Sequence, residues 1–166
     1  YGSNPVFPFA QTVGGVNMDA LSVAGLAKNV VVIGKGKSQL DAYLDRALAA
    51  QDRVATLEPT PEKGYYYRSD HFSFAKHGLP MLYFEGGEDL VNGGTAAGNA
   101  AAEDYTKNRY HGPKDEYDPN WDWSGVAADL KLYYDVGRAL AETTEWPNWV
   151  EGDEFRAIRD KDRAGQ

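Results

Sequence analysis

Asp19 and His111 have side chains that often bind metal ions. They lie far apart in the sequence, but each has neighbours that are compatible with a role as a metal ligand. Asp19 ends a short apolar run, and His111 lies in a loop before Gly112 and Pro113. A carboxylate and an imidazole are both common ligands of Zn²⁺ in proteins. The ordinary alternatives are a strand-end turn or cap for Asp19 and a solvated loop position for His111. Two ligands are too few for a complete metal site.

Further polar residues along the chain could act on a substrate. Tyr110 precedes His111, so its phenol could stabilise an oxyanion beside a metal ion. Arg68 could bind a substrate carboxylate or carbonyl, although most arginines form surface ion pairs. His71 is either a site residue or part of the first turn of a short helix. Asp115 could orient His111 through a hydrogen bond, and a cap or loop role fits its position equally well.

The composition limits the classes of protein to which this chain can belong. Of its 166 residues, 42% are hydrophobic, which is enough for a core and argues against wholesale disorder. The net charge is −8 and no basic patch is visible, so we expect no nucleic-acid partner. No apolar stretch approaches roughly 18 residues, so we expect no membrane span. The absence of cysteine excludes disulfides and Cys-ligated zinc.

Apolar patterns predict strands that alternate with helices. Strands are expected over residues 13–18, 30–33, 53–57 and 81–84. Helices are expected after Ser38 as far as Leu48, over residues 71–77 and over residues 124–142. This alternation indicates an α/β fold with mostly parallel central strands. Ligand sites in such sheets lie at the carboxyl ends of the strands, where Asp19 is expected.

Two segments carry weaker patterns. Residues 85–109 are rich in Gly, Ala and Asn, and we expect a long loop with one helical turn at most. Residues 151–166 mix acidic and basic side chains and predict an exposed tail or a peripheral helix.

Three motifs carry a resemblance to a known family. They are, in chain order, Asn17-Met18-Asp19, then Arg68-Ser69-Asp70-His71 with Phe74, Gly78 and Pro80, then Tyr110-His111 with Asp115. Over roughly residues 1–142 their order and spacing resemble the N-x-D, R-S-D-H-x-x-F-x-x-x-G-x-P and Y-H-x-x-x-D segments of the M28 family of zinc metallopeptidases. Any one motif alone would be a weak signal.

The resemblance implies a three-layer α/β/α fold with a mostly parallel central sheet, of the zinc-exopeptidase type. Residues 1–145 would be the C-terminal half of the catalytic domain, and residues 146–166 a tail or peripheral helix. The family's Glu base and remaining ligands would then precede residue 1, so the N-terminal part of the same protein is an expected partner. Without it we expect the chain to be inactive and prone to aggregation. A secreted or periplasmic location is also implied.

The resemblance further implies an aminopeptidase, which hydrolyses N-terminal residues from a peptide substrate by means of a hydroxide bound to two zinc ions. In this scheme Asp19 and His111 are metal ligands, and Tyr110 is the catalytic oxyanion donor. The implied substrate-binding residues are Arg68, Asp70, His71 and Phe84.

Two other functions remain open on the same scaffold. One is a glutaminyl-cyclase-like zinc acyltransferase, with which the Asp70-His71 pair is compatible. The intact Arg68-Ser69 and Tyr110 favour the peptidase. The other is a catalytically inactive binding domain, against which the retention of Asp19 and His111 argues.

Overall fold

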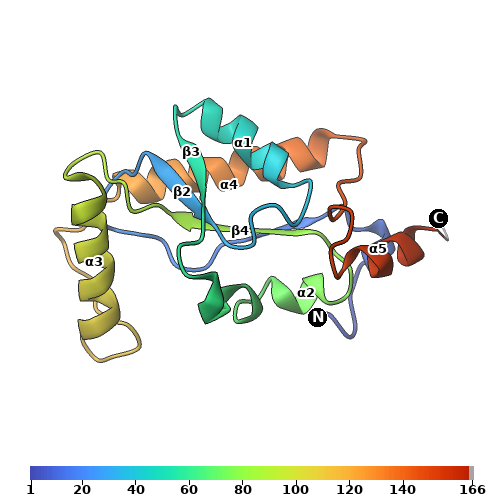
Figure 1. The fold of residues 1–166 in the computed structure, drawn as a ribbon, viewed down its shortest axis with the longest axis horizontal. Helices are drawn as coiled ribbons and strands as arrows, with labels where there is room; N and C mark the ends of the chain where they lie inside the picture. The colour runs from blue at the N-terminus through green and yellow to red at the C-terminus, as the bar shows by residue number, and fades with distance from the viewer. Residues whose placement is uncertain (165–166) are drawn as a thin grey trace.

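Four short strands form one sheet in the order β1-β4-β2-β3 in a computed structural model that describes residues 1–164 (Figure 1). The strands are β1 Gly15–Asn17, β2 Asn29–Val32, β3 Val54–Leu57 and β4 Met81–Gly86. β1 and β4 are parallel, as are β2 and β3, whereas β2 and β4 are antiparallel. Two of the three pairings are therefore parallel. β1 lies at one edge of the sheet, and its carboxyl end leads to Asp19.

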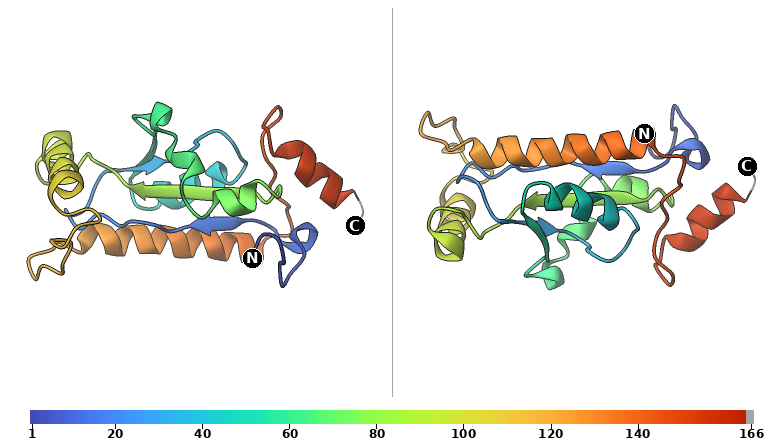
Figure 2. Two further views of the ribbon diagram at one scale, coloured as in Figure 1. Left: turned by 90° about the horizontal axis from the view of Figure 1, so that it is seen from below. Right: turned by 90° about the horizontal axis from the view of Figure 1, so that it is seen from above.

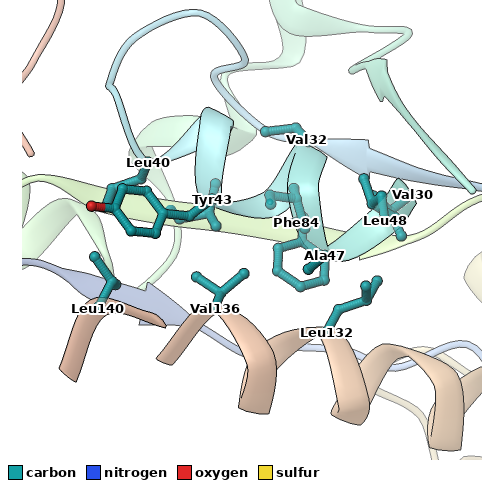
Figure 3. Close-up of a cluster of buried hydrophobic side chains, with 12 residues drawn as sticks. Val30, Val32, Leu40, Tyr43, Ala47, Leu48, Phe84, Leu132, Val136 and Leu140 are labelled. Atoms are coloured by element: carbon teal, nitrogen blue, oxygen red, sulfur yellow. The ribbon is translucent and has the colours of Figure 1, made fainter. Parts of the chain in front are cut away.

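Two helices cover one face of the sheet, and the main hydrophobic core lies between them and the strands. These are α1 Asp41–Ala49 and α4 Ser124–Glu142. In Figure 3, Leu40, Tyr43, Ala47 and Leu48 at α1 approach Leu132, Val136 and Leu140 of α4, with strand residues Val30, Val32 and Phe84 beside them. The spacing of these side chains gives each helix one apolar face. In β2, the burial of alternate residues directs Val30 and Val32 into this core.

The opposite face carries shorter elements. They are α2 Phe72–Ala75 and the 3₁₀ helices η2 Pro61–Lys63 and η3 Tyr65–Tyr67. A second cluster of buried side chains lies here and contains Ile33, Tyr66, Ala75, Tyr83, Trp149 and Phe155. With a helical layer on each side of the sheet, the structure confirms the three-layer α/β/α fold and the mostly parallel sheet.

The residues near the C-terminal end of the described chain pack against the rest of the domain. Helix α5 (Arg156–Arg163) lies beside the N-terminal segment, which includes the short helix η1 (Phe9–Gln11) (Figures 1 and 2). The Arg159 guanidinium is buried and donates hydrogen bonds to the carbonyl oxygens of Phe9 at 2.7 Å and Thr12 at 2.8 Å. Gly78 has φ +86°, and a Cβ there would lie 2.8 Å from the backbone nitrogen of Arg159. Residues 146–164 thus include a peripheral helix with buried anchors, while residues 165–166 of the expected tail lie outside the described residues.

Helix α3 (Gly94–Asn108) replaces most of the loop expected over residues 85–109, so that expectation was wrong. The segment contains five alanines, the strongest helix-forming residue. Gly93 adopts φ 93° just before the helix. Within the helix, Gly98 permits close approach to the chain, because a Cβ at this position would lie 2.0 Å from the carbonyl oxygen of Glu88. The glycines therefore position the helix rather than prevent it.

The α4 bounds agree with the expected helix, but its buried face differs. Helical spacing in the sequence predicts a buried face with Val126, Leu130, Tyr134 and Gly137, but only Val126 of these four is buried, and Leu130 and Tyr134 are 43% and 61% exposed. The core side carries Leu132, Val136 and Leu140. Apolar side chains on two sides of the helix, such as Leu130 and Leu132, made its buried face ambiguous from the sequence.

Helices α3 and α5 lie at opposite ends of the sheet (Figure 2). Among residues 1–164, no helix is long and apolar enough to cross a membrane.

Candidate metal and substrate site

Asp19 lies just beyond the carboxyl end of β1 and is oriented by a loop 50 residues later in the chain. The hydroxyl of Ser69 donates a 2.6 Å hydrogen bond to Oδ2 of Asp19. The side-chain amide of Asn17 donates a 2.8 Å hydrogen bond to the same hydroxyl oxygen. Asn17 is nearly buried at 9% exposure, whereas Asp19 is exposed. The first and second sequence motifs therefore meet at the edge of the sheet where an α/β fold places its ligands.

A second carboxylate, Glu85, lies near the same edge and was not expected from the sequence. The hydroxyl of Tyr83 donates a hydrogen bond to Glu85. Burial raises the pKa of the Glu85 carboxyl, the Tyr83 hydrogen bond opposes the rise, and the Asp19 charge adds to it. The parallel pairing of β1 with β4, in which Asn17 aligns with Tyr83, explains this proximity. An acidic residue directly after an apolar strand was the signal that could have identified Glu85.

His71 is a fully buried residue in the second core. Its ring lies 4.7 Å from that of Tyr66 and 4.9 Å from that of Tyr83, measured between centroids. Neither ring nitrogen has a hydrogen-bond partner within residues 1–164. Burial lowers the pKa of His71 to about 4, although the Asp19 charge acts in the opposite direction. His71 is therefore neutral near pH 7, and it anchors the Ser69 loop by packing instead of facing a substrate.

Phe84 also lies in a core and not in a pocket wall. It has no exposed surface, and its ring stacks on that of Tyr133 with centroids 4.1 Å apart. Successive residues of a strand point to opposite faces, so Phe84 turns toward α1 and α4 while Tyr83 and Glu85 turn the other way. Its burial leaves no surface for the substrate contact that was expected. Arg68 and Asp70, by contrast, are exposed beside Ser69.

Tyr110 and His111 follow helix α3 in an exposed turn. Their rings stack with centroids 3.9 Å apart. His111 has φ 55°, in the left-handed region, which non-glycine residues adopt at an energetic cost and often at functional sites. Asp115 does not orient His111, because its carboxylate accepts a 2.9 Å hydrogen bond from the hydroxyl of Tyr105. The hydrogen bonds within residues 1–164 do not link His111 to Asp19.

The described residues offer donor atoms of the types that bind zinc, but too few of them lie together to form a zinc site. The Asp19 carboxylate has one oxygen held by Ser69, and the exposed His111 imidazole offers nitrogen donors. Among residues 1–164, however, no three His, Asp or Glu side chains come together as a possible metal site. A catalytic zinc site uses three protein ligands. Asp19 and His111 therefore have the chemistry of individual zinc ligands, and residues 1–164 do not bring a complete set of ligands together.

The fold and the site define an α/β protein whose polar residues gather at the carboxyl ends of β1 and β4. A family model, described as peptidase family M28, matches residues 1–134. No curated protein and no solved structure gives a match to this chain. The chain belongs to peptidase family M28. Its function is thus that of a peptidase, a hydrolase of peptide bonds in a metallopeptidase family.

Proposed function

We propose that this chain forms the rear part of a zinc-dependent aminopeptidase, which removes N-terminal residues from peptides. The observation that carries the proposal is the hydrogen bond from Ser69 to Asp19, because it joins two of the three family motifs at one edge of the sheet. The family match supports the peptidase function on which the proposal builds.

Asp19 and His111 would hold zinc together with further ligands from outside this chain. A bound zinc ion lowers the pKa of a water molecule and polarises a carbonyl group. Ser69 keeps the Asp19 carboxylate in one orientation, which favours binding without reorganisation. The left-handed backbone of His111 supports a functional role for this loop position, because non-glycine residues adopt that conformation at an energetic cost.

Exposed polar groups near the two ligands would act on the peptide. The Tyr110 side chain is 53% exposed, and its hydroxyl is proposed to donate a hydrogen bond to the developing oxyanion, an effect of about 3 kcal/mol for a well-placed donor. The exposed Arg68 guanidinium would fix a substrate carbonyl or carboxylate. Asp70, also exposed, would favour a cationic group such as a free amine.

The edge of the sheet at β1 is the surface on which we propose that the remaining part of the domain packs. Within residues 1–164, β1 is paired on one side only, to β4. An open, mainly apolar groove of about 430 Å³ runs beside it, lined by residues that include Val13, Val16, Met18, Tyr133 and Leu140. An unpaired strand edge next to apolar surface favours the addition of another strand. The proposed upstream part would bring the Glu base and the other ligands, so the isolated chain is proposed to be inactive.

A secreted or periplasmic location is part of the proposal and is supported by the family resemblance alone. Fractionation of cells that produce the protein would test it. Activity confined to the cytoplasm would contradict the proposed location.

The activity itself is tested with the protein that carries the whole catalytic domain. Peptides with a free N-terminus should release their first amino acid, whereas N-acetylated versions of the same peptides should remain uncleaved. The variant Asp19→Asn should lose this activity, and Asp89→Asn, a surface change at the Lys28 ion pair, should retain it. Cleavage of acetylated and free peptides at equal rates would contradict an aminopeptidase. A cyclised product from a peptide beginning with Gln would indicate an acyltransferase instead.

A further inference from the structure

Residues 147–163 lie beyond α4 and contact the rest of the domain at three separate places (Figures 1 and 2). The first place is the turn after β2. The backbone nitrogen of Val150 donates a 2.9 Å hydrogen bond to the carbonyl oxygen of Lys37. The Lys37 ammonium pairs with the nearly buried Asp153 carboxylate at 2.8 Å and lies 5.4 Å from the centroid of the Phe155 ring. Backbone bonding, charge and aromatic contact thus act together at this turn.

The second place is the cluster of buried side chains on the face of the sheet that carries α2. Trp149 and Phe155 both belong to this cluster, and the Trp149 indole nitrogen bonds to the carbonyl oxygen of Gly78 at 2.8 Å. Arg156, in the first turn of α5, donates a 2.6 Å hydrogen bond to the carbonyl oxygen of Trp149. This last bond joins α5 to the extended residues before it, so residues 147–163 are also held together among themselves.

The third place is the segment that leads into β1. Arg159 donates hydrogen bonds to three carbonyl oxygens of residues 9–13, at 2.7, 2.8 and 3.3 Å. Arg163 donates to a fourth at 2.9 Å. The two arginines are four residues apart and so share one face of α5. Burial, together with the nearby charge of Arg163, lowers the pKa of Arg159 to about 10, so its guanidinium is still charged near pH 7.

We propose that residues 147–163 form a C-terminal strap that opens and closes as one unit, with Arg159 as the contact that keeps it closed over residues 9–13. The main core between α1, α4 and the sheet is formed without any strap residue among those described, so the strap can open while this core remains packed. Contiguous segments with their own contacts commonly open as cooperative units. The strap also lies outside residues 1–134, which the family model matches.

The test is native-state hydrogen exchange, measured by mass spectrometry on the protein that carries the whole catalytic domain. Arg159→Met keeps an apolar side chain of similar length but removes the hydrogen bonds from a charged donor. Exchange in residues 147–163 and in residues 9–13 should become about 10- to 100-fold faster, by the same factor in both. Exchange in α1 and α4 should stay as in the wild type.

Two further variants make this comparison specific. Lys161→Met changes an exposed residue of the same helix and should exchange like the wild type. Arg159→Lys keeps the charge but lacks the planar fork of donors, so its exchange should lie between those of the wild type and Arg159→Met. Faster exchange confined to residues 9–13, or equally faster exchange in α1 and α4, would overturn the proposal.

A second measurement needs no variant. In low concentrations of denaturant, amides that open together share one free energy of opening. In the wild type, residues 147–163 and residues 9–13 should converge on one value, below the value for α1 and α4. Different values for the two segments, or one value shared with α4, would overturn the proposal even if Arg159→Met does not fold. Neither measurement depends on peptidase activity.

Discussion

The indole nitrogen of Trp149 donates a 2.8 Å hydrogen bond to the carbonyl oxygen of Gly78, at the end of the loop and helix that carry the second motif. Trp149 has no exposed surface and packs on Phe155 with ring centroids 5.1 Å apart. A residue beyond the matched family segment thus supports the face of the sheet that positions Ser69. Trp149 and Phe155, near the C-terminus, therefore contribute to the stability of the domain.

We expect Trp149→Ala to lower the free energy of unfolding by about 3 to 5 kcal/mol, because it leaves a cavity and an unpaired carbonyl. Trp123→Ala is the control, since Trp123 is 48% exposed and should cost far less. Urea unfolding of both variants measures the difference. Equal losses of stability in the two variants would show that the second core does not depend on Trp149.

The buried ion pair between Arg53 and Asp129 joins the start of β3 to α4. Their side chains are 4% and 2% exposed, and the nitrogen and oxygen are 2.7 Å apart. Burial raises the pKa of the Asp129 carboxyl, and the charge of Arg53 opposes this rise. Removing one partner leaves the other charge buried without compensation.

Asp129→Asn should therefore lower the free energy of unfolding by about 3 to 5 kcal/mol. Asp135→Asn breaks the more exposed pair with Lys131 on the same helix and should change it by less than about 1 kcal/mol. Denaturant titration of the two variants provides the comparison. A cost for Asp129→Asn as small as that for Asp135→Asn would contradict the importance of the buried pair.

The neutral, buried His71 predicts a loss of stability in acid. Its pKa is lowered from about 6.5 in the unfolded chain to about 4 in the folded protein. The unfolded state therefore binds more protons between these values, so stability rises with pH through this window and falls as pH drops from 6.5 to 4. The loss should amount to about 2 to 3 kcal/mol at pH 4.

The measurement is the free energy of unfolding at pH 7 and at pH 4. In His71→Gln the difference between the two pH values should shrink by most of this amount. The wild-type protein, measured at the same two pH values, is the reference. If His71→Gln keeps the full wild-type difference, another group accounts for the acid sensitivity.

Strong local periodicity made part of this fold predictable. The five apolar residues from Leu40 to Leu48 that follow helical spacing are all buried at α1. The apolar runs ending near Asn17 and Phe84 form β1 and β4. An apolar run does not reveal which of its side chains face a core, so the sequence could not show that Phe84, a substrate-binding residue by resemblance, is buried. Local composition also led to a wrong prediction at α3. The glycines suggested a loop, although the alanines of the same segment favour a helix.

The candidate site was predictable only as separate pieces. Asp19 could be placed at the end of a strand, but its partner Ser69 belongs to a loop distant in sequence, and no local pattern announces that hydrogen bond. The same applies to Glu85, whose proximity to Asp19 follows from the pairing of β1 with β4. Such relationships arise from tertiary structure, whereas motifs and periodicity describe only local structure.

The most direct test of the proposed function is the release of N-terminal amino acids by the protein with its whole catalytic domain, before and after complete removal of metal by a chelator. We predict that activity falls to background when the metal content reaches zero and returns when zinc is added. Undiminished activity in protein shown to be free of metal would contradict the account.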